Sequence, residues 1–105
     1  MKPYALRPHA REDRRNEVRY YRHEAGAKVA TQLVDALEKA LDEIKQHPGI
    51  GSPALGRELG VAGMRTWGIQ GFPLSLWYFE REFHTDIARL VGQRQDAIGV
   101  EVDEG

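Results

Sequence analysis

Five side chains in the second half of the sequence could take part in acid–base chemistry: Arg65, Tyr78, Arg81, His84 and Arg89. Cleavage of RNA without a metal needs a general base for the 2′-hydroxyl, a general acid for the leaving oxygen and cations beside the developing phosphorane charge. However, all four lysines lie in the first 45 residues, and no His, Tyr or Lys follows His84. The inventory therefore favours a binding protein with no catalytic residue, and RNA cleavage is the alternative.

Metal and cofactor sites lack their usual sequence patterns. The four histidines, at positions 9, 23, 47 and 84, show no HxxxH, HxH or HExxH spacing. No glycine-rich stretch continues into the Lys-Ser/Thr of a phosphate-binding loop. The absence of cysteine excludes disulfides and thiolate chemistry, and no apolar run approaches the roughly 20 residues that span a bilayer. We expect no metal, no cofactor, no membrane and a cytoplasmic location.

A helical hairpin is predicted to position the later elements. An extended segment over residues 4–7 ends at Pro8, which suits the first turn of a helix. The pattern predicts a helix over residues 8–25, a break at Gly26, and a second helix of about twenty residues that ends at residues 47–49. The predicted inner faces are Ala10, Arg14, Val18, Tyr21 and Ala25 on the first helix and Ala30, Leu33, Val34, Leu37, Leu41 and Ile44 on the second.

Three strand-like segments follow an irregular, glycine-rich connection over residues 48–63, which has one helical turn near residues 55–59. The strands are expected at residues 64–69, 74–81 and 85–91, and their short separators predict an antiparallel meander. The sequence thus predicts one α+β domain over residues 1–105. Its order is an N-terminal strand, an antiparallel helical hairpin on one face of the sheet, a three-stranded meander, and an acidic tail over residues 97–105.

The stretch LSLWYFER, residues 74–81, alternates between two faces. Leu74, Leu76 and Tyr78 point to one side, which we assign to the core beneath the helices. Trp77 and Phe79 point to the other side, where no further layer of the chain is expected, so a partner protein is the favoured cover. Two alternatives are that the tail folds back over them, or that they stack nucleic-acid bases.

The first quarter of the chain is rich in arginine, although the formal net charge is only −1. Acidic residues at helical spacings could pair with these arginines within the helix, so a solvated helix face is the favoured interpretation. An acidic partner or nucleic acid is the alternative. The arginines are Arg7, Arg11, Arg14, Arg15, Arg19 and Arg22, and the acidic residues are Glu12, Asp13, Glu17 and Glu24.

Several short motifs occur in a consistent order along the chain. LRPHARED contains Leu6, Pro8, Ala10 and Asp13 in a Leu-x-Pro-x-Ala-x-x-Asp pattern, and paired tyrosines follow at residues 20 and 21. LVDALEKALDEIKQHPGIG, GFPLSLWYFE and GQRQD complete the set. In this order the motifs resemble the RelE/ParE superfamily of toxins from type II toxin–antitoxin modules. The last strand and tail lack the acid–base His and Tyr of the RNA-cleaving branch, so the sequence is most similar to the ParE branch.

The resemblance implies a toxin that inhibits DNA gyrase and is neutralised by a cognate, ParD-like antitoxin, with DNA contacted only through the antitoxin complex. The antitoxin would fold over the toxin as a helix and an extended piece. A ribosome-dependent mRNA endonuclease and an inactive antitoxin-binding homologue are the alternatives. The implied gyrase-binding residues are Arg94, Gln95 and Asp96, and the implied antitoxin-binding residues are Trp67, Trp77, Phe79 and Arg81.

Overall fold

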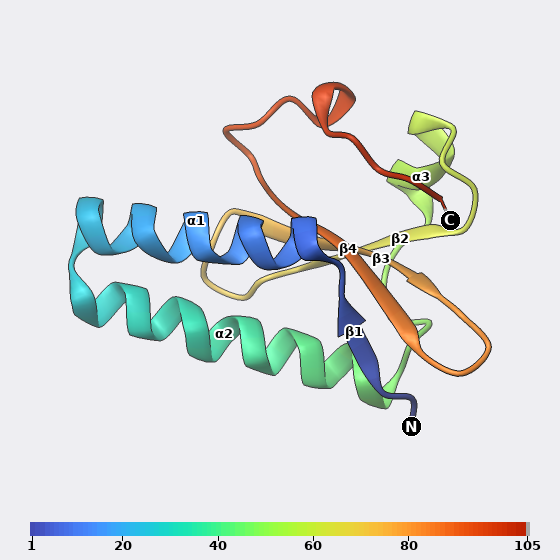
Figure 1. Cartoon of the computed structure of the whole chain (residues 1–105), viewed down its shortest axis with the longest axis horizontal. Coiled ribbons are helices and arrows are strands. Elements are labelled where there is room, and N and C mark those ends of the chain that lie inside the picture. The colour runs from blue at the N-terminus through green and yellow to red at the C-terminus, as the bar shows by residue number, and fades with distance from the viewer. Residues whose placement is uncertain (105) are drawn as a thin grey trace.

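The computed structural model describes residues 1–104; Gly105, the end of the predicted acidic tail, lies outside the described residues. The elements are β1 (Tyr4–Leu6), α1 (Pro8–Ala25), α2 (Ala27–Gln46), α3 (Ala54–Leu59), β2 (Met64–Gly68), β3 (Leu74–Glu80), β4 (Thr85–Gly92) and a 3-10 turn, η1 (Ala97–Gly99). The sheet has the order β1-β4-β3-β2, with β1 parallel to β4 and the other pairs antiparallel (Figure 1). The structure confirms the predicted α+β fold.

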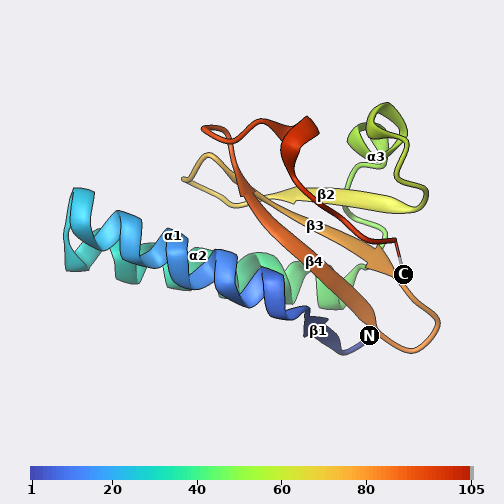
Figure 2. The same ribbon diagram turned by 45° about the horizontal axis from the view of Figure 1, so that its top comes forward.

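The α1–α2 hairpin covers one face of the sheet, and α3 and the chain after β4 lie over the opposite face (Figure 2). Gly26 joins the two helices. Its φ of 93° lies in a backbone region that residues with a Cβ rarely adopt, so a glycine is favoured at this position. The apolar stripe of α2 is confirmed except at Val34, which is 36% exposed. The buried residues of α2 are Ala30, Leu33, Leu37, Ala40, Leu41 and Ile44.

The predicted inner face of α1 is partly wrong. Ala10 is buried and Val18 and Tyr21 pack against the core, but Arg14 and Ala25 are exposed. Instead, Asp13 and Glu17 turn towards the end of the sheet and pair with arginines there. The first helix is therefore held to the sheet by charged contacts as well as by apolar packing.

The arginines of α1 lie on an exposed helix face, as the sequence favours, but the ion pairs with acidic residues that the helical spacing allows are not formed. Asp13 and Glu17 are engaged outside the helix, so they cannot neutralise their neighbours on α1. Within residues 1–104, five exposed arginines of α1 form no ion pair: Arg11, Arg14, Arg15, Arg19 and Arg22.

The apolar cluster between the sheet and the α1–α2 hairpin is the hairpin-facing core. Tyr78 lies in it together with Leu74 and Leu76, as predicted. Its hydroxyl donates to the Pro48 carbonyl at 2.8 Å and accepts from the Gly51 N–H at 2.8 Å. These bonds tie the connection after α2 to the middle of the sheet. Burial raises the pKa of Tyr78 because it disfavours the phenolate.

Replacing Tyr78 with phenylalanine is expected to lower the free energy of unfolding by about 1 to 3 kcal/mol, because the Gly51 N–H loses a buried hydrogen-bond partner. Urea unfolding followed by circular dichroism measures the loss. The matched control is Tyr4→Phe, at a tyrosine that is 38% exposed on the edge strand. An equal effect of the two substitutions would contradict the structural role given to the Tyr78 hydroxyl.

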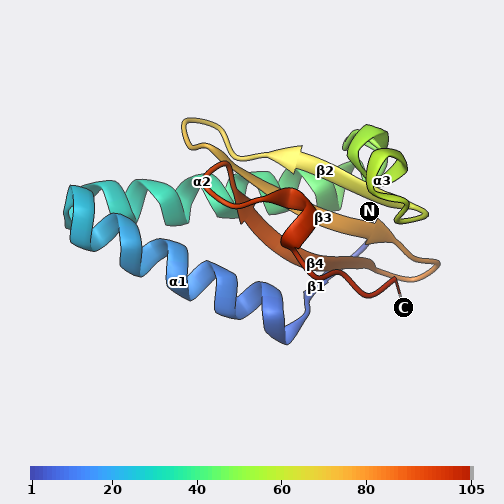
Figure 3. The ribbon, with the colours of Figure 1, turned by 90° about the horizontal axis from the view of Figure 1, so that it is seen from above.

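Trp77 and Phe79 face away from the hairpin, as predicted, but each is only 2% exposed. They form a second apolar cluster with Met64, Ala88 and Val91. The expectation that no part of the chain covers this face is wrong, because α3 and the tail lie over it. The covering side chains are Leu55, Leu59, Val61, Ala97, Val100 and Val102. The tail therefore folds back over Trp77 and Phe79, which is one of the alternatives that the sequence leaves open (Figure 3).

Candidate functional site

The face that carries Trp77 and Phe79 lies beneath α3 and the tail, with open pockets on either side of the tail, and we call this region the aromatic groove. Its floor is the second apolar cluster, and the tail, residues 97–104, lies across it. After β4, a turn closed by the hydrogen bond from the Gln95 N–H to the Gly92 carbonyl leads into η1. From there the chain runs as an extended segment over the sheet. Val100 and Val102 contact the floor, while Glu101 and Asp103 remain exposed.

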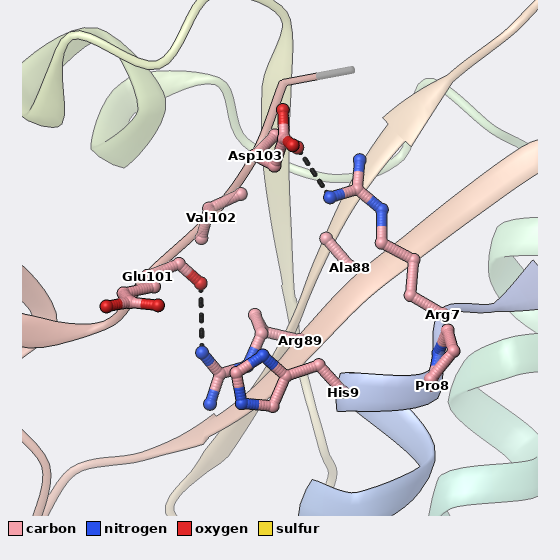
Figure 4. A pocket seen from close by; sticks show the side chains of 8 residues that line it. All are labelled: Arg7, Pro8, His9, Ala88, Arg89, Glu101, Val102 and Asp103. Atoms are coloured by element: carbon pink, nitrogen blue, oxygen red, sulfur yellow. Dashed lines mark hydrogen bonds between the residues drawn. The ribbon is translucent and has the colours of Figure 1, made fainter.

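Three arginines hold the tail through its backbone. Arg89 donates to the carbonyl of Glu101 at 2.9 Å, and Arg7 donates to the carbonyl of Asp103, as the dashed lines in Figure 4 show. Arg81 donates to the carbonyl of Glu104. Because all three acceptors are main-chain oxygens, these contacts depend on the path of the tail rather than on its side chains.

Asp86 fixes two of these arginines in place. Arg7 contacts both of its carboxylate oxygens at 2.9 Å, and Arg81 contacts one at 3.1 Å. The same two guanidinium groups lie 5.4 Å and 4.7 Å from the centre of the Phe79 ring, distances typical of cation–π contacts. Burial acts to raise the pKa of Asp86, but the hydrogen bonds from Arg7 and Arg81 together outweigh it and leave that pKa lowered.

The lowered pKa of Asp86 predicts a specific pH dependence. Protonation favours the unfolded chain, so the contribution of Asp86 is fully present above its ordinary pKa of 3.8 and is lost as the pH falls through its lower folded value. Asp86→Asn should cost about 2 kcal/mol between pH 5 and pH 8, and the difference from the unaltered chain should shrink below pH 4. Urea unfolding across this range measures it. Asp42→Asn, on the exposed side of α2, is the control; a constant Asp86→Asn effect down to pH 2 would contradict the assignment.

Two further ion pairs join α1 to the end of the sheet. Asp13 forms a two-point pair with Arg89 at 2.8 and 3.0 Å, and also accepts from the Leu90 N–H at 3.0 Å. Glu17, only 5% exposed, forms a two-point pair with Arg94 at 3.1 Å. These contacts fix the start of the tail relative to α1.

The residues predicted to contact gyrase lie together in the turn after β4. Arg94 stacks on Tyr20, with the guanidinium carbon 3.9 Å from the ring centre, and 45% of its side chain is exposed. The side chain of Gln95 accepts from the Gly92 N–H, and that of Asp96 accepts from the Ile98 N–H. Gln95 and Asp96 thus shape the turn, and Arg94 is the member that presents a positive charge at the surface.

The residues predicted to contact the antitoxin do not form one surface. Arg81 stacks on Phe79 beside Trp77 in the aromatic groove. Trp67 packs against the hairpin side of the sheet, where its indole N–H donates to Glu43 at 3.2 Å. The structure therefore separates Trp67 from the other three residues.

The residues considered for RNA cleavage are not assembled into a site. Arg89 is buried and paired, and the hydroxyl of Tyr78 is engaged beneath the sheet. His84 lies in the turn between β3 and β4, whereas Arg65 lies on the edge strand β2, opposite Tyr78 of β3. No group of three or more metal-ligating side chains occurs within residues 1–104. Over the same residues, no helix has the length and apolar character to cross a membrane.

Sequence reasoning missed the pairing roles of Asp13, Glu17 and Asp86. A signal was present for the first two, because Ala10, Asp13 and Glu17 follow a helical spacing rotated by one residue from the stripe chosen. For Asp86, a lone carboxylate in a strand-like segment was the only sequence cue. Its two arginine partners lie 79 and 5 residues away in sequence.

Comparison with known proteins defines the class and then the family. The fold is similar to a solved structure described as the chromosomal ParDE TA system from P. aeruginosa, with a TM-score of 0.75 and 20% identity over 88% of this chain and 96% of that one. No curated protein matches the sequence. The family model for the ParE toxin of the type II toxin-antitoxin system, parDE, matches residues 4–97. The chain therefore belongs to the ParE toxin family, and the resemblance inferred from its motifs is confirmed.

Proposed function

We propose that this chain inhibits DNA gyrase in the cytoplasm, arrests growth, and is neutralised by a cognate ParD-like antitoxin. The match to the ParE toxin family over residues 4–97 carries the proposal. The geometry offers no comparable support for RNA cleavage, since the side chains that it would need are engaged or separated. An inhibitor that acts by binding requires an exposed recognition feature rather than an assembled catalytic group.

Arg94 is the proposed centre of gyrase recognition. Glu17 and the Tyr20 ring hold its guanidinium in one orientation, which lowers the entropy lost when a partner binds. Arginine has five N–H donors, and the pair with Glu17 uses two of them. The remaining donors are available at the surface of the turn, and Gln95 and Asp96 set its shape.

Removing Arg94 is expected to raise the concentration needed for gyrase inhibition at least tenfold, as for an arginine at the centre of an interface. Arg94→Met should be combined with Glu17→Gln, because a single substitution would leave the Glu17 carboxylate buried and unpaired. Glu17→Gln alone loosens the hold on Arg94 but keeps its guanidinium, so it should weaken inhibition less than the double variant does. Arg19→Met, at an exposed arginine of the same helix, is the matched control and should retain inhibition. The concentration dependence of supercoiling measures the effect. Undiminished inhibition by the folded double variant would exclude Arg94 from the interface.

The aromatic groove is the proposed antitoxin site, with Trp77, Phe79 and Arg81 as its anchors. Aromatic and arginine side chains commonly dominate protein interfaces, and this groove places them together. Trp67, on the other side of the sheet, would belong to a separate contact of an antitoxin that wraps around the toxin. Because the tail covers Trp77 and Phe79, binding of the antitoxin at the groove requires the tail to move.

A further inference from the structure

The tail occupies the aromatic groove through contacts that another peptide could make. Main-chain carbonyls of residues 101, 103 and 104 accept from Arg89, Arg7 and Arg81. Any extended peptide presents such carbonyls at regular intervals. The groove thus has the properties of a strand-binding site in which backbone contacts supply affinity and pockets for alternate side chains supply specificity.

The side chains of the tail define what the groove accepts. Val100 and Val102, two positions apart, pack on the apolar floor, while Glu101 and Asp103 are exposed. Around the floor, three guanidinium groups pair with two carboxylates, Asp13 and Asp86, which leaves the rim with an excess of positive charge. The matching ligand is an extended, acidic segment with small branched apolar residues at alternate positions.

The tail fills the groove incompletely. A cavity of about 590 Å³ lies between the tail, β4 and the start of α1, and it is lined by Arg7, His9, Ala88, Arg89 and Val102 (Figure 4). A second cavity of about 480 Å³ separates α3 from residues 96–98, and the neighbouring Ile98 is 83% exposed. Both cavities are open to solvent, so the tail leaves space beside it in the groove that a larger ligand could fill.

The family match supports a division between groove and tail. It ends at residue 97, so residues 98–104 lie outside it, whereas every residue of the floor lies within it. We propose that the tail is a displaceable occupant of the aromatic groove, and that an extended acidic segment of the antitoxin, with alternate small apolar residues, replaces it. This inference rests on the proposed function, because it assigns the antitoxin as the competing ligand.

Competition between the tail and the antitoxin predicts that weakening the hold of the tail will tighten antitoxin binding. A competitor can bind only those molecules in which the groove is open. Its apparent affinity is therefore the intrinsic affinity multiplied by the open fraction. Val100→Ala with Val102→Ala removes four methyl groups from the contact with the floor, which should raise that fraction. The antitoxin encoded beside this chain should therefore bind the full-length double variant about three- to tenfold more tightly than the unaltered chain. Ile98→Ala, at an exposed side chain, should leave the affinity unchanged and is the matched control.

Isothermal titration of the antitoxin into each folded protein provides the measurement. Equal or weaker binding to the double variant would overturn the proposal, because it would mean that the tail stays in place or forms part of the antitoxin interface. A second measurement uses no antitoxin: a labelled peptide with the tail sequence AIGVEVDE should bind the double variant at least threefold more tightly than the unaltered chain, by fluorescence anisotropy. Equal peptide binding to both would also contradict displacement. Failure of the antitoxin to bind any of these proteins would instead contradict the proposed function, and the peptide titration would still decide whether the tail can be displaced.

Discussion

Replacing Asp13 with alanine is expected to lower the free energy of unfolding by about 3 to 5 kcal/mol. The carboxylate accepts two hydrogen bonds from Arg89 and one from the Leu90 N–H, at 2.8 to 3.0 Å. Arg89 is 8% exposed, so its charge would lose its partner in a site that water reaches poorly. Chemical unfolding followed by circular dichroism measures the loss.

Two further variants separate the ion pair from other effects of the Asp13 substitution. Glu12→Ala, at an exposed position on the same helix, should change stability by less than about 0.5 kcal/mol. Asp13→Leu combined with Arg89→Met should recover most of the loss, because removing both charges leaves neither unpaired. A cost below about 1 kcal/mol for Asp13→Ala would contradict the buried pair.

Replacing Trp77 with alanine is expected to cost about 3 to 5 kcal/mol. Its indole is 2% exposed between the sheet and the layer formed by α3 and the tail, so truncation leaves a large cavity. Trp67→Ala is the matched control and should cost less, about 1 to 2 kcal/mol, because Trp67 is only half-buried. Thermal unfolding of both variants measures the difference. Equal losses would show that the tail and α3 do not shield Trp77 in solution.

The helices and strands could be predicted because each carries a regular apolar pattern. The stripe of α2 and the alternation of β3 are strong because residues such as Leu37 and Leu76 must face the same core. Pro8 and Gly26 mark the ends of α1 as expected. Every predicted element is present, with bounds that agree to within a residue or two.

The faces of β4 could not be predicted from alternation alone. Trp77 pairs with Arg89 and Tyr78 pairs with Ile87, which leaves Ala88 without a partner opposite it, as a β-bulge. The bulge shifts the alternation by one residue. As a result Ile87 and Leu90, three positions apart, both pack in the hairpin-facing core, and Ala88 and Val91 both pack in the aromatic groove. No turn residue or glycine next to Ala88 marks this shift.

The candidate site was predicted only in part, because charged residues can point inwards when a distant partner is present. Asp13 and Glu17 were interpreted as solvated because their partners, Arg89 and Arg94, lie more than 70 residues away. The same limit applies to the tail. Its acidic side chains disfavour it as the cover for Trp77 and Phe79, yet Val100 and Val102 alternate with them and cover the groove.

Gyrase inhibition and its reversal by antitoxin form the central claim. A plasmid supercoiling assay with purified gyrase tests it most directly, with this chain titrated in the presence and absence of the antitoxin encoded beside it. We predict dose-dependent loss of supercoiling with accumulation of cleaved plasmid, and restoration of supercoiling when antitoxin is added. Full supercoiling at every concentration of folded, antitoxin-free protein would contradict the claim.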